Sequence, residues 1–368
     1  KRAAAIILAA ADAGDHLAEA AASILLAMGK ISPLSDDPAA AQMYAQRAVP
    51  WLLANVGGGS MQVQFYLAVC YQAGRGVEKD EGAAARYYKL AADQGHSHAQ
   101  NNFGGCNYNG SCGLLLDYTM AVRYFMLAAG QGHIGALYNL GNAFTRGCGV
   151  ARDVKQAAAL YHQAAELGSS DAQYMLALCF EHGTGVDKNE IQAARYHKLA
   201  AEQGHPSAQF KLGDCYRRGS GTVQSEAEAV RYFKLAADQG NRDGQYSLAI
   251  AYMGGNGVPQ NPMEAMKYLK LAADQGHPEA QHACGQLCLA VADKRHKATH
   301  YFQLAADQGF MAAQFDLGTC YEEGVVIGKN LKEAGRYYKL AAAQGHAAAQ
   351  EKLAPKKTFF GWSKSPFE

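Results

Sequence analysis

The chain has 368 residues, of which 34 are Lys or Arg and 33 are Asp or Glu, so its formal net charge is only +1. A balance this even argues against a nucleic-acid groove or a surface for acidic membranes, because both need an excess of positive charge. A hydrophobic content of 49% excludes wholesale disorder, and no apolar run is long enough to span a membrane.

The first apolar segment is predicted to be the second helix of a pair that lacks its first helix. Ile6, Ile7 and Leu8 lie in this segment, and Gly14 ends it. The end of a stacked helical array normally needs a polar cap, and this end is apolar. We therefore expect a preceding helix or a partner to cover it. Because the sequence begins with Lys1 and not with Met, an upstream targeting segment or domain stays open.

One string then recurs through most of the chain. Leu-Ala-Ala-x-Gln-Gly and its near variants return every 36 residues, with one spacing of 37 and one of 33. The closing glycines are Gly95, Gly132, Gly168, Gly204, Gly240, Gly276, Gly309 and Gly345. Such a period indicates one supersecondary unit per repeat. We predict a single array over residues 1–354, with a tail at 355–368 and units at about 20–64, 65–100, 101–137, 138–173, 174–209, 210–245, 246–281, 282–314 and 315–350.

Each unit is predicted to form two amphipathic helices. In unit 210–245, apolar residues follow the helical period before and after the break at Gly219-Ser220-Gly221. A pair of this size cannot bury both apolar faces alone, so neighbouring pairs must stack. The predicted fold is all-α, a right-handed α/α superhelical solenoid of about nine helix pairs. A slot that holds only small residues predicts close helix contact in each pair: Ala68, Gly104, Gly141, Ala177, Gly213, Ala249, Gly285 and Gly318.

Five of the nine cysteines occupy one repeat position: Cys70, Cys106, Cys179, Cys215 and Cys320. Other units place Ala143, Ala251 or Leu287 there, so the position is a small apolar slot and its thiols are predicted to be inert and unpaired. Equivalent positions in stacked pairs lie too far apart for a disulfide. This pattern favours a reducing soluble compartment, such as the cytoplasm or an organelle interior.

The unit at 282–314 is three residues short and holds a pattern that resembles a zinc site. Cys284 and Cys288 are four residues apart, as are His296 and His300. The repeat pattern places the cysteines inward and His300 outward, so the four side chains do not converge and no metal is predicted. We expect the array to change curvature here and at the long connector of the first unit.

Other chemical motifs are weak or absent. The histidines after the closing glycines, such as His96 and His133, are expected to be polar residues of the helix junction, and glycine loops such as Gly183-Thr184-Gly185 are expected to be turns. The paired aromatics, such as Tyr232-Phe233, are expected to be core and not base-stacking platforms. No nucleophile motif occurs, so neither a catalytic residue nor a cofactor is predicted.

A stripe on each first helix varies from unit to unit while the scaffold positions repeat. Such a stripe is expected of a surface adapted to a partner, although an ordinary solvated surface stays an alternative. Its residues are Asn102, Asn139, Asn142, Arg146, Met175, His182, Lys211, Asp214, Arg218, Asp316 and Glu323. By analogy with related solenoids, the stripe would line the concave face.

The tail, "KKTFFGWSKSPFE", leaves the repeat pattern after Pro355. It carries four aromatics, Phe359, Phe360, Trp362 and Phe367, which are too many for a solvated terminus. Two readings stay open. The tail either caps the apolar end of the last repeat, or docks into another molecule, including a second copy of the chain.

The strings "AQFKLGDCYRRGSGT", "AQYSLAIAYMGGNGV" and "EAMKYLKLAADQGHPEAQ" resemble the Sel-one-like repeat family (SLR), relatives of the tetratricopeptide repeat. The resemblance implies a non-enzymatic adaptor or scaffold that binds proteins through its concave face, with no role in binding nucleic acid. A secreted, cysteine-rich branch of that family has a second Cys where this chain has Ala92, Ala201 and Ala237, so a β-lactam-binding hydrolase is a weaker alternative. The other alternative function is that of a structural subunit of a large assembly, even an organellar one.

Overall fold

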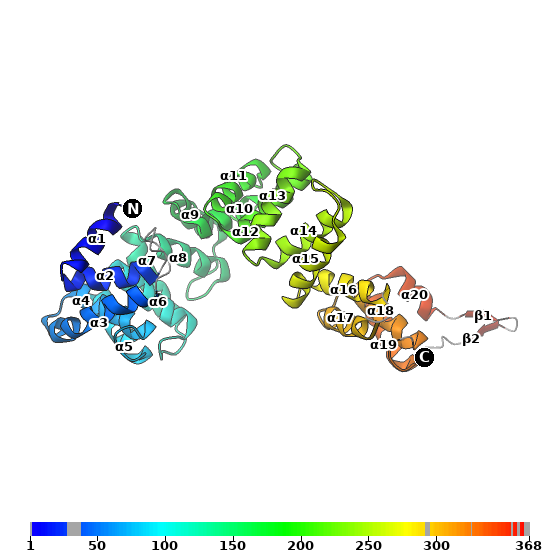
Figure 1. Ribbon diagram of the computed structural model, residues 1–368, viewed down its shortest axis with the longest axis horizontal. Helices are drawn as coiled ribbons and strands as arrows, with labels where there is room; N and C mark the ends of the chain where they lie inside the picture. The colour runs from blue at the N-terminus through cyan, green and yellow to red at the C-terminus, as the bar shows by residue number, and fades with distance from the viewer. Residues whose placement is uncertain are drawn as a thin grey trace. The chain divides into compact units, whose positions relative to one another are not determined.

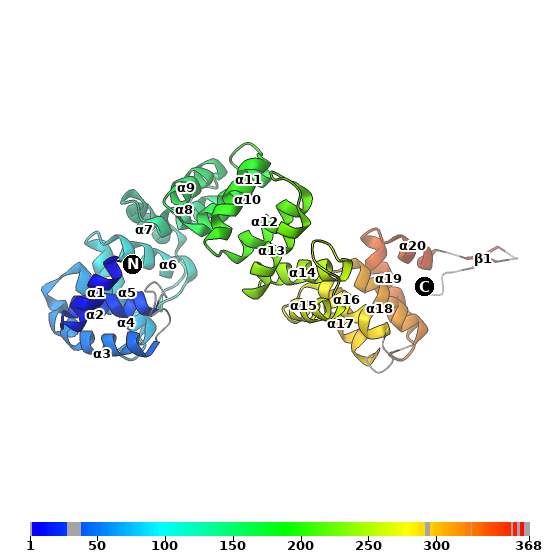
Figure 2. The ribbon, with the colours of Figure 1, turned by 45° about the horizontal axis from the view of Figure 1, so that its top comes forward.

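The computed structural model describes residues 2–27, 38–290, 295–324, 326–354, 356–358 and 361–363. Two compact units divide the chain, one over Lys1–Lys188 and the other over Asn189–Glu368. Within each unit, every described helix packs against the next helix of the chain (Figures 1 and 2). Each unit is therefore a solenoid of stacked helix pairs, and the predicted all-α repeat fold is confirmed. That the two units form one continuous domain with the predicted repeat boundaries stays a prediction.

The helices of the first unit are 11 to 18 residues long, apart from one short 3-10 turn. They are α1 (Arg2–Asp12), α2 (His16–Ala27), α3 (Pro38–Asn55), η1 (Val56–Gly58), α4 (Met61–Ala73), α5 (Glu81–Asp93), α6 (Ser97–Asn109), α7 (Tyr118–Gly130), α8 (Ile134–Arg146), α9 (Val154–Glu166) and α10 (Ser170–His182).

The second unit continues the same alternation of first and second helices. Its elements are α11 (Glu190–Glu202), α12 (Pro206–Arg218), α13 (Glu226–Asp238), α14 (Arg242–Gly254), α15 (Pro262–Asp274), α16 (Pro278–Ala290), α17 (Arg295–Asp307), α18 (Met311–Glu323), α19 (Leu331–Ala343), α20 (Ala347–Leu353), β1 (Lys356–Thr358) and β2 (Gly361–Ser363).

Local sequence sets where these helices begin and end. Gly219 follows α12 in the left-handed conformation, with φ at 71°, and its N–H binds the carbonyl of Cys215. The next helix, α13, begins after Ser225, whose hydroxyl accepts from the N–H of Glu228. A left-handed glycine and a short polar cap satisfy helix-end groups that would otherwise lack partners. The glycine loops are thus turns, as predicted.

The recurrent histidines do more at the junctions than the sequence indicated. His133 lies at the N-cap of α8, where its Nδ1 accepts from the N–H of Ala136 at 3.1 Å. His96 and His205 cap α6 and α12 in the same way, at 3.2 and 3.1 Å. A ring nitrogen that accepts a hydrogen bond carries no proton, so these caps require neutral histidine.

The small slot of the first helix is filled from the partner helix by an aromatic ring. A Cβ added at Gly141 would lie 2.6 Å from Cε1 of Tyr161, and one added at Gly213 would lie 2.7 Å from Cδ1 of Phe233. Tyr161 and Phe233 are themselves fully buried. The prediction of close helix contact at this slot is confirmed, because glycine is the residue that lets the ring approach the backbone.

A ladder of buried glutamines, not predicted from the sequence, joins each first helix to the second helix of its own pair and to the preceding pair. Gln100 is 3% exposed, and its Nε2 donates to the carbonyl of Ala92 at 3.1 Å. Its Oε1 accepts from Nε2 of Gln131 at 2.8 Å. The same contact recurs between Gln239 and Gln209 at 2.7 Å. Because a buried amide is costly without partners, each buried glutamine is fixed by the last turn of the preceding helix and by the glutamine that follows the second helix of its own pair.

The structure overturns one cysteine prediction. Cys70, Cys179 and Cys320 are buried free thiols, as expected. Cys106 instead forms a disulfide with Cys112, whose Cα lies 5.7 Å away. The prediction compared only equivalent positions of different repeats, whereas Cys112 lies in the loop of the same repeat, the one with a 37-residue spacing. Cys112 adopts a φ of 57° and is 3% exposed, which brings it beside α6.

Several predictions concern the termini and connectors. In α1, Ile7 and Leu8 pack against the cluster of Ala11 and Leu26, and Ile6 is 63% exposed. The long connector "GKISPLSDDP" and the loop 291–294 that shortens the eighth unit lie almost entirely outside the described residues. The curvature changes expected there stay predictions.

The tail contains a short strand pair that the sequence analysis did not predict. β1 and β2 are antiparallel, and Lys357 is opposite Trp362. Phe359, Phe360 and Phe367 lie outside the described residues, and only the backbone of Trp362 is described. The choice between a cap and a docking segment therefore stays open.

Candidate functional site

The predicted stripe residues all lie on first helices. Asn102 lies on α6 and Asn139, Asn142 and Arg146 on α8, while Met175 and His182 lie on α10. In the second unit, Lys211, Asp214 and Arg218 lie on α12, and Asp316 and Glu323 lie on α18. Each is exposed or half-buried, so the stripe is a surface feature of each unit. Whether these residues bind a partner stays a prediction.

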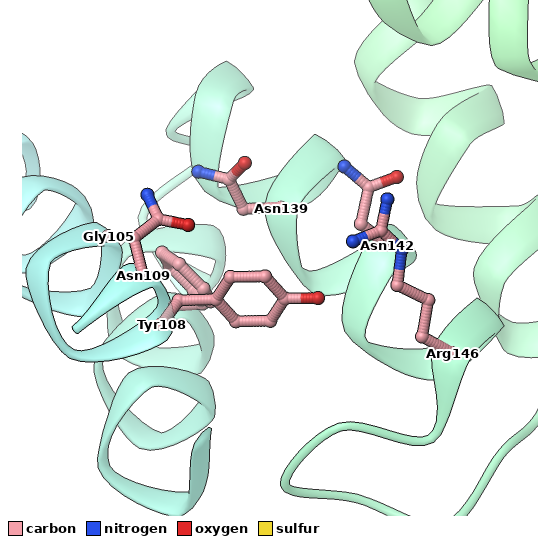
Figure 3. A pocket seen from close by; sticks show the side chains of 7 residues that line it. Gly105, Tyr108, Asn109, Asn139, Asn142 and Arg146 are labelled. Carbon is pink, nitrogen blue, oxygen red and sulfur yellow. The ribbon is translucent and has the colours of Figure 1, made fainter. Parts of the chain in front are cut away.

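A pocket of about 200 Å³ opens on the stripe of the first unit. Three predicted residues line it from α8, namely Asn139, Asn142 and Arg146 (Figure 3). The remaining lining residues are Gly105, Tyr108, Asn109 and Phe125. The pocket thus lies between two first helices, α6 and α8, and Phe125 of α7 contributes to its lining.

Hydrogen bonds orient the two carboxamides of α8. The hydroxyl of Tyr161 donates to Oδ1 of Asn142 at 2.7 Å, so the Nδ2 group of Asn142 is its remaining donor. Nδ2 of Asn139 donates to Oδ1 of Asn101 at 3.0 Å. Asn142 therefore presents N–H groups to the pocket because a buried phenol holds its oxygen.

Arg146 supplies the positive charge of the pocket. It lies in the last turn of α8, where a cation interacts favourably with the helix dipole. It is exposed, and it forms no ion pair with any residue in the described part of the chain. A guanidinium without a carboxylate partner keeps its planar donors available for a ligand.

Tyr108 reaches from α6 toward Asn142 and Arg146 (Figure 3). Its ring lies 5.1 Å from that of Tyr118 and 6.1 Å from that of Phe125. The hydroxyl oxygen is buried and makes no hydrogen bond of standard geometry among the described residues, although Cys148 and Arg146 are its polar neighbours. Burial, followed by the neighbouring Cys148, raises the pKa of Tyr108, so the phenol stays protonated and can donate.

Three lining residues were not predicted from the sequence, although signals for them existed: Gly105, Tyr108 and Asn109. Gly105 and Asn109 occupy the positions of Asn142 and Arg146 one repeat earlier, so the stripe pattern already included them. In most units an aromatic directly follows the recurrent cysteine position, whereas after Cys106 the order is Asn107-Tyr108. This one-residue shift moves the aromatic ring from the core face toward the stripe.

Two carboxylates on the stripe of the second unit have partners within the chain. Asp214 forms ion pairs with Arg217 and with Arg218, the latter at 2.9 Å. Oδ2 of Asp316 lies 2.8 Å from Nε2 of His282 and accepts from Gln286 at 3.2 Å. Asp214, Arg218 and Asp316 of this stripe therefore already have partners.

No group of three or more potential metal ligands is found among the described residues. Cys284 is buried whereas His296 and His300 are exposed, which agrees with the predicted orientation of these side chains. Burial raises the pKa of Cys70, Cys179, Cys284 and Cys320 to about 11. These thiols are consequently protonated near neutral pH and are weak nucleophiles.

A stack of helix pairs joined by glycine turns, with variable first helices, defines an α-helical repeat scaffold. The Sel1 repeat profile matches eight segments of this chain: 62–96, 97–133, 134–169, 170–205, 206–241, 242–277, 278–310 and 312–346. The chain belongs to the Sel1 repeat family, as its resemblance to the Sel-one-like repeats indicated. Proteins of this family generally mediate protein–protein interactions and are generally non-catalytic scaffolds.

Two solved structures are similar over most of the chain. One is a protective antigen present in uropathogenic Escherichia coli strains, which displays an SLR fold. Its sequence is 31% identical, the TM-score is 0.70, and the match covers 94% of this chain and 72% of the antigen chain. The other is a Sel1 repeat protein from Oxalobacter formigenes, 28% identical with a TM-score of 0.61, covering 82% of this chain and 88% of its own.

None of the described helices is both long and apolar enough to cross a bilayer. Ala92, Ala201 and Ala237, where the cysteine-rich branch would have its second cysteine, are buried at 4% exposure or less. These three positions hold buried alanines and so cannot supply the second cysteine that the cysteine-rich branch has there.

Proposed function

We propose that this protein is a non-enzymatic adaptor or scaffold that holds a protein partner along the stripe of its first helices. The observation that carries the proposal is the contrast between constant and variable positions. Glycine slots, caps and buried glutamines recur in repeat after repeat, while exposed positions of the first helices change in chemistry. A constant scaffold with a variable surface is what selective recognition of an extended partner requires.

The test is affinity capture from a native extract of the source organism, followed by binding measurements with the recovered protein. A stripe variant, Asn102→Ala/Asn139→Ala/Lys211→Ala, is compared with a control, Lys198→Ala/Arg231→Ala/Lys267→Ala, whose substituted side chains are exposed on second helices. We expect the stripe variant to weaken binding at least tenfold and the control to leave it unchanged. Equal effects of both variants, or failure to capture any stoichiometric partner, would contradict the proposal.

The compartment belongs to the same proposal, and one observation bears on it. The sequence favours a reducing soluble compartment, whereas the Cys106–Cys112 disulfide would persist in an oxidising one. Mass spectrometry of protein isolated without reductant, with free thiols alkylated first, decides between them. Loss of two protons at Cys106 and Cys112 would contradict the reducing compartment.

Self-association through the tail is a separate part of the proposal. Sedimentation velocity of the chain with and without residues 356–368 tests it, because a docking segment would dissociate a dimer when removed. A cap would instead lower the melting temperature of a chain that is monomeric throughout. If both quantities stay unchanged, neither role is supported.

A further inference from the structure

We propose that the pocket between α6 and α8 binds a carboxylate of the partner, carried by an acidic side chain or by a chain terminus. This inference rests on the proposed function, because it names the chemistry that the stripe of the first unit would recognise. Its starting point is the set of groups that line the pocket. Arg146 and the carboxamides of Asn109, Asn139 and Asn142 supply hydrogen-bond donors, and no carboxylate is among the described lining residues.

Nδ2 of Asn139 already donates to Asn101, but other donors of the pocket lack an acceptor in the described part of the chain. Tyr161 occupies the oxygen of Asn142, so the amide presents N–H groups. Arg146 has no ion pair in the described part of the chain. The buried hydroxyl of Tyr108 makes no hydrogen bond of standard geometry there either, although Arg146 and Cys148 are close to it. Because an unpaired buried hydroxyl costs free energy, an acceptor placed between these three groups would be stabilised by all of them.

A comparison with other helix pairs of the chain shows why the hydroxyl of Tyr108 is not used in a hydrogen bond between the two helices of its pair. In two other pairs the second-helix tyrosine donates to the residue at the same repeat position: Tyr88 to Gln72 at 2.7 Å and Tyr338 to Glu322 at 2.6 Å. In the pair of α6 and α7 the second-helix ring is Phe125, which has no hydroxyl, and Tyr108 stands at the repeat position of Gln72. The internal bond is thereby replaced by a donor that faces the pocket (Figure 3).

The space for the ligand comes from Gly105. A Cβ added there would meet nothing within 4 Å. Two of the equivalent first-helix positions hold Val69 and Leu178, whose side chains would occupy this volume. Glycine is less favourable than alanine inside a helix, and at Gly105 close packing does not explain its presence. Gly105 therefore marks the place where the pocket is kept open.

The volume and the charge of the pocket restrict the class of ligand that it can bind. A volume of about 200 Å³ is below the roughly 300–1,000 Å³ of pockets that enclose small molecules, and it suits one side chain or one chain end. A single guanidinium flanked by amides matches the charge and plane of one carboxylate. A phosphate group, with nearly two charges, generally requires a cluster of arginines.

Titration of the full-length chain with short blocked peptides tests the proposal, with binding followed by saturation-transfer NMR of the peptide. The probes are acetyl-Ala-Ala-Glu-Ala-Ala-amide, the same peptide with Gln for Glu, and acetyl-Ala-Ala-Gln-Ala-Ala with a free carboxyl end. We expect a carboxylate peptide to bind and the fully neutral peptide to bind at least tenfold more weakly. If the side-chain carboxylate binds, the source is an acidic residue. If only the free end binds, the source is a chain terminus.

Three variants locate the binding. Arg146→Ala should weaken it about tenfold or more, which is the scale of one charge-assisted bond. Gly105→Leu should abolish it without loss of folding, because the added side chain enters open space. Arg218→Ala, at the equivalent position of α12 where Asp214 already pairs with the cation, should leave it unchanged. Equal affinity for the neutral peptide, or binding that survives both Arg146→Ala and Gly105→Leu, would overturn the proposal.

These outcomes are separable from those of the proposed function. If a captured partner depends on the stripe but binds Arg146→Ala and wild type equally, the carboxylate proposal fails and the scaffold function stands. If the peptides bind through Arg146 but no partner depends on the stripe, the pocket stands and the scaffold function fails.

Discussion

The stripes of the two units use similar residues in opposite ways. On α8, Asn142 and Arg146 are four residues apart, and the cation has no ion pair among the described residues. On α12, Asp214 and Arg218 occupy the same two repeat positions, and they pair with each other at 2.9 Å. One difference, a carboxamide in place of a carboxylate, decides whether the arginine is available to a ligand.

This comparison shows that the scaffold does not determine the chemistry of its surface. The helices α8 and α12 have the same length, the same type of cap and the same left-handed glycine at the end. Their second helices bury Tyr161 and Phe233 against equivalent glycines. Binding capacity therefore depends on a few exposed residues, and the variation among repeats is where selectivity can arise.

The largest expected effect is the loss of stability when the slot glycines are substituted, and comparing the two units tests whether they share one scaffold. Gly141→Ala and Gly213→Ala should each destabilise the chain by about 1–3 kcal/mol, because the new methyl group meets a buried ring. Urea unfolding measures the change. Gly105→Ala is the control, and it should stabilise by roughly 0.5–1 kcal/mol, since its Cβ enters open space. A cost in only one unit would show that the slot differs between them.

The disulfide distinguishes the first unit from the second. Cys112→Ser should destabilise the first unit by about 2 kcal/mol, because closing a short loop restricts the unfolded chain. Hydrogen exchange, read separately for α6 and α12, measures this. We expect faster exchange in α6 and no change in α12. A chain isolated with both thiols free would make the substitution neutral and contradict the structure at this point.

Acid should loosen the start of α8 in the first unit more than the start of α16 in the second. Burial, together with His98, lowers the pKa of His133 from 6.5 to about 4. The unfolded chain therefore binds more protons below pH 6.5, and stability is lost as the pH falls from 6.5 toward 4. We expect a loss of about 1–2 kcal/mol after allowing for partial exposure of the ring.

His277 provides the comparison in the second unit. Burial also lowers its pKa, but Glu279 and Asp243 act in the opposite direction, so α16 should open less than α8 between pH 6.5 and 4. His133→Asn serves as the control, because Asn241 already caps α14. Amide exchange that is independent of pH at the start of α8, once corrected for the intrinsic rate, would be inconsistent with a neutral histidine cap.

The smallest effect is expected at the ion pairs of α12. Asp214→Asn gives α12 the same residue pair as α8 and removes two ion pairs whose arginines are exposed. Such pairs contribute about 0–1 kcal/mol each, so the melting temperature should change little and should depend less on salt. A large destabilisation would show that Asp214 holds α12 in place and is more than a partner for Arg218.

Much of the scaffold follows from the sequence within one repeat. Helical periodicity and the glycines of the loops predicted the helix pairs, and the small slot predicted the close contact that Gly141 makes with Tyr161. The stripe residues were identified on the first helices because they depart from the repeat while their neighbours follow it. These features depend on local propensity and on the period of the apolar residues, both of which are visible in 36 residues.

Only the tertiary structure decided which distant side chains meet. The disulfide of Cys106 depends on a left-handed backbone at Cys112, the glutamine ladder joins residues about 30 positions apart, and the pocket forms because Tyr108 of α6 approaches Arg146 of α8. A repeat pattern fixes which way a side chain faces. It does not fix what stands opposite, because that depends on how successive helix pairs pack and on the single residues, such as Gly105 and Phe125, that leave space or remove a partner there.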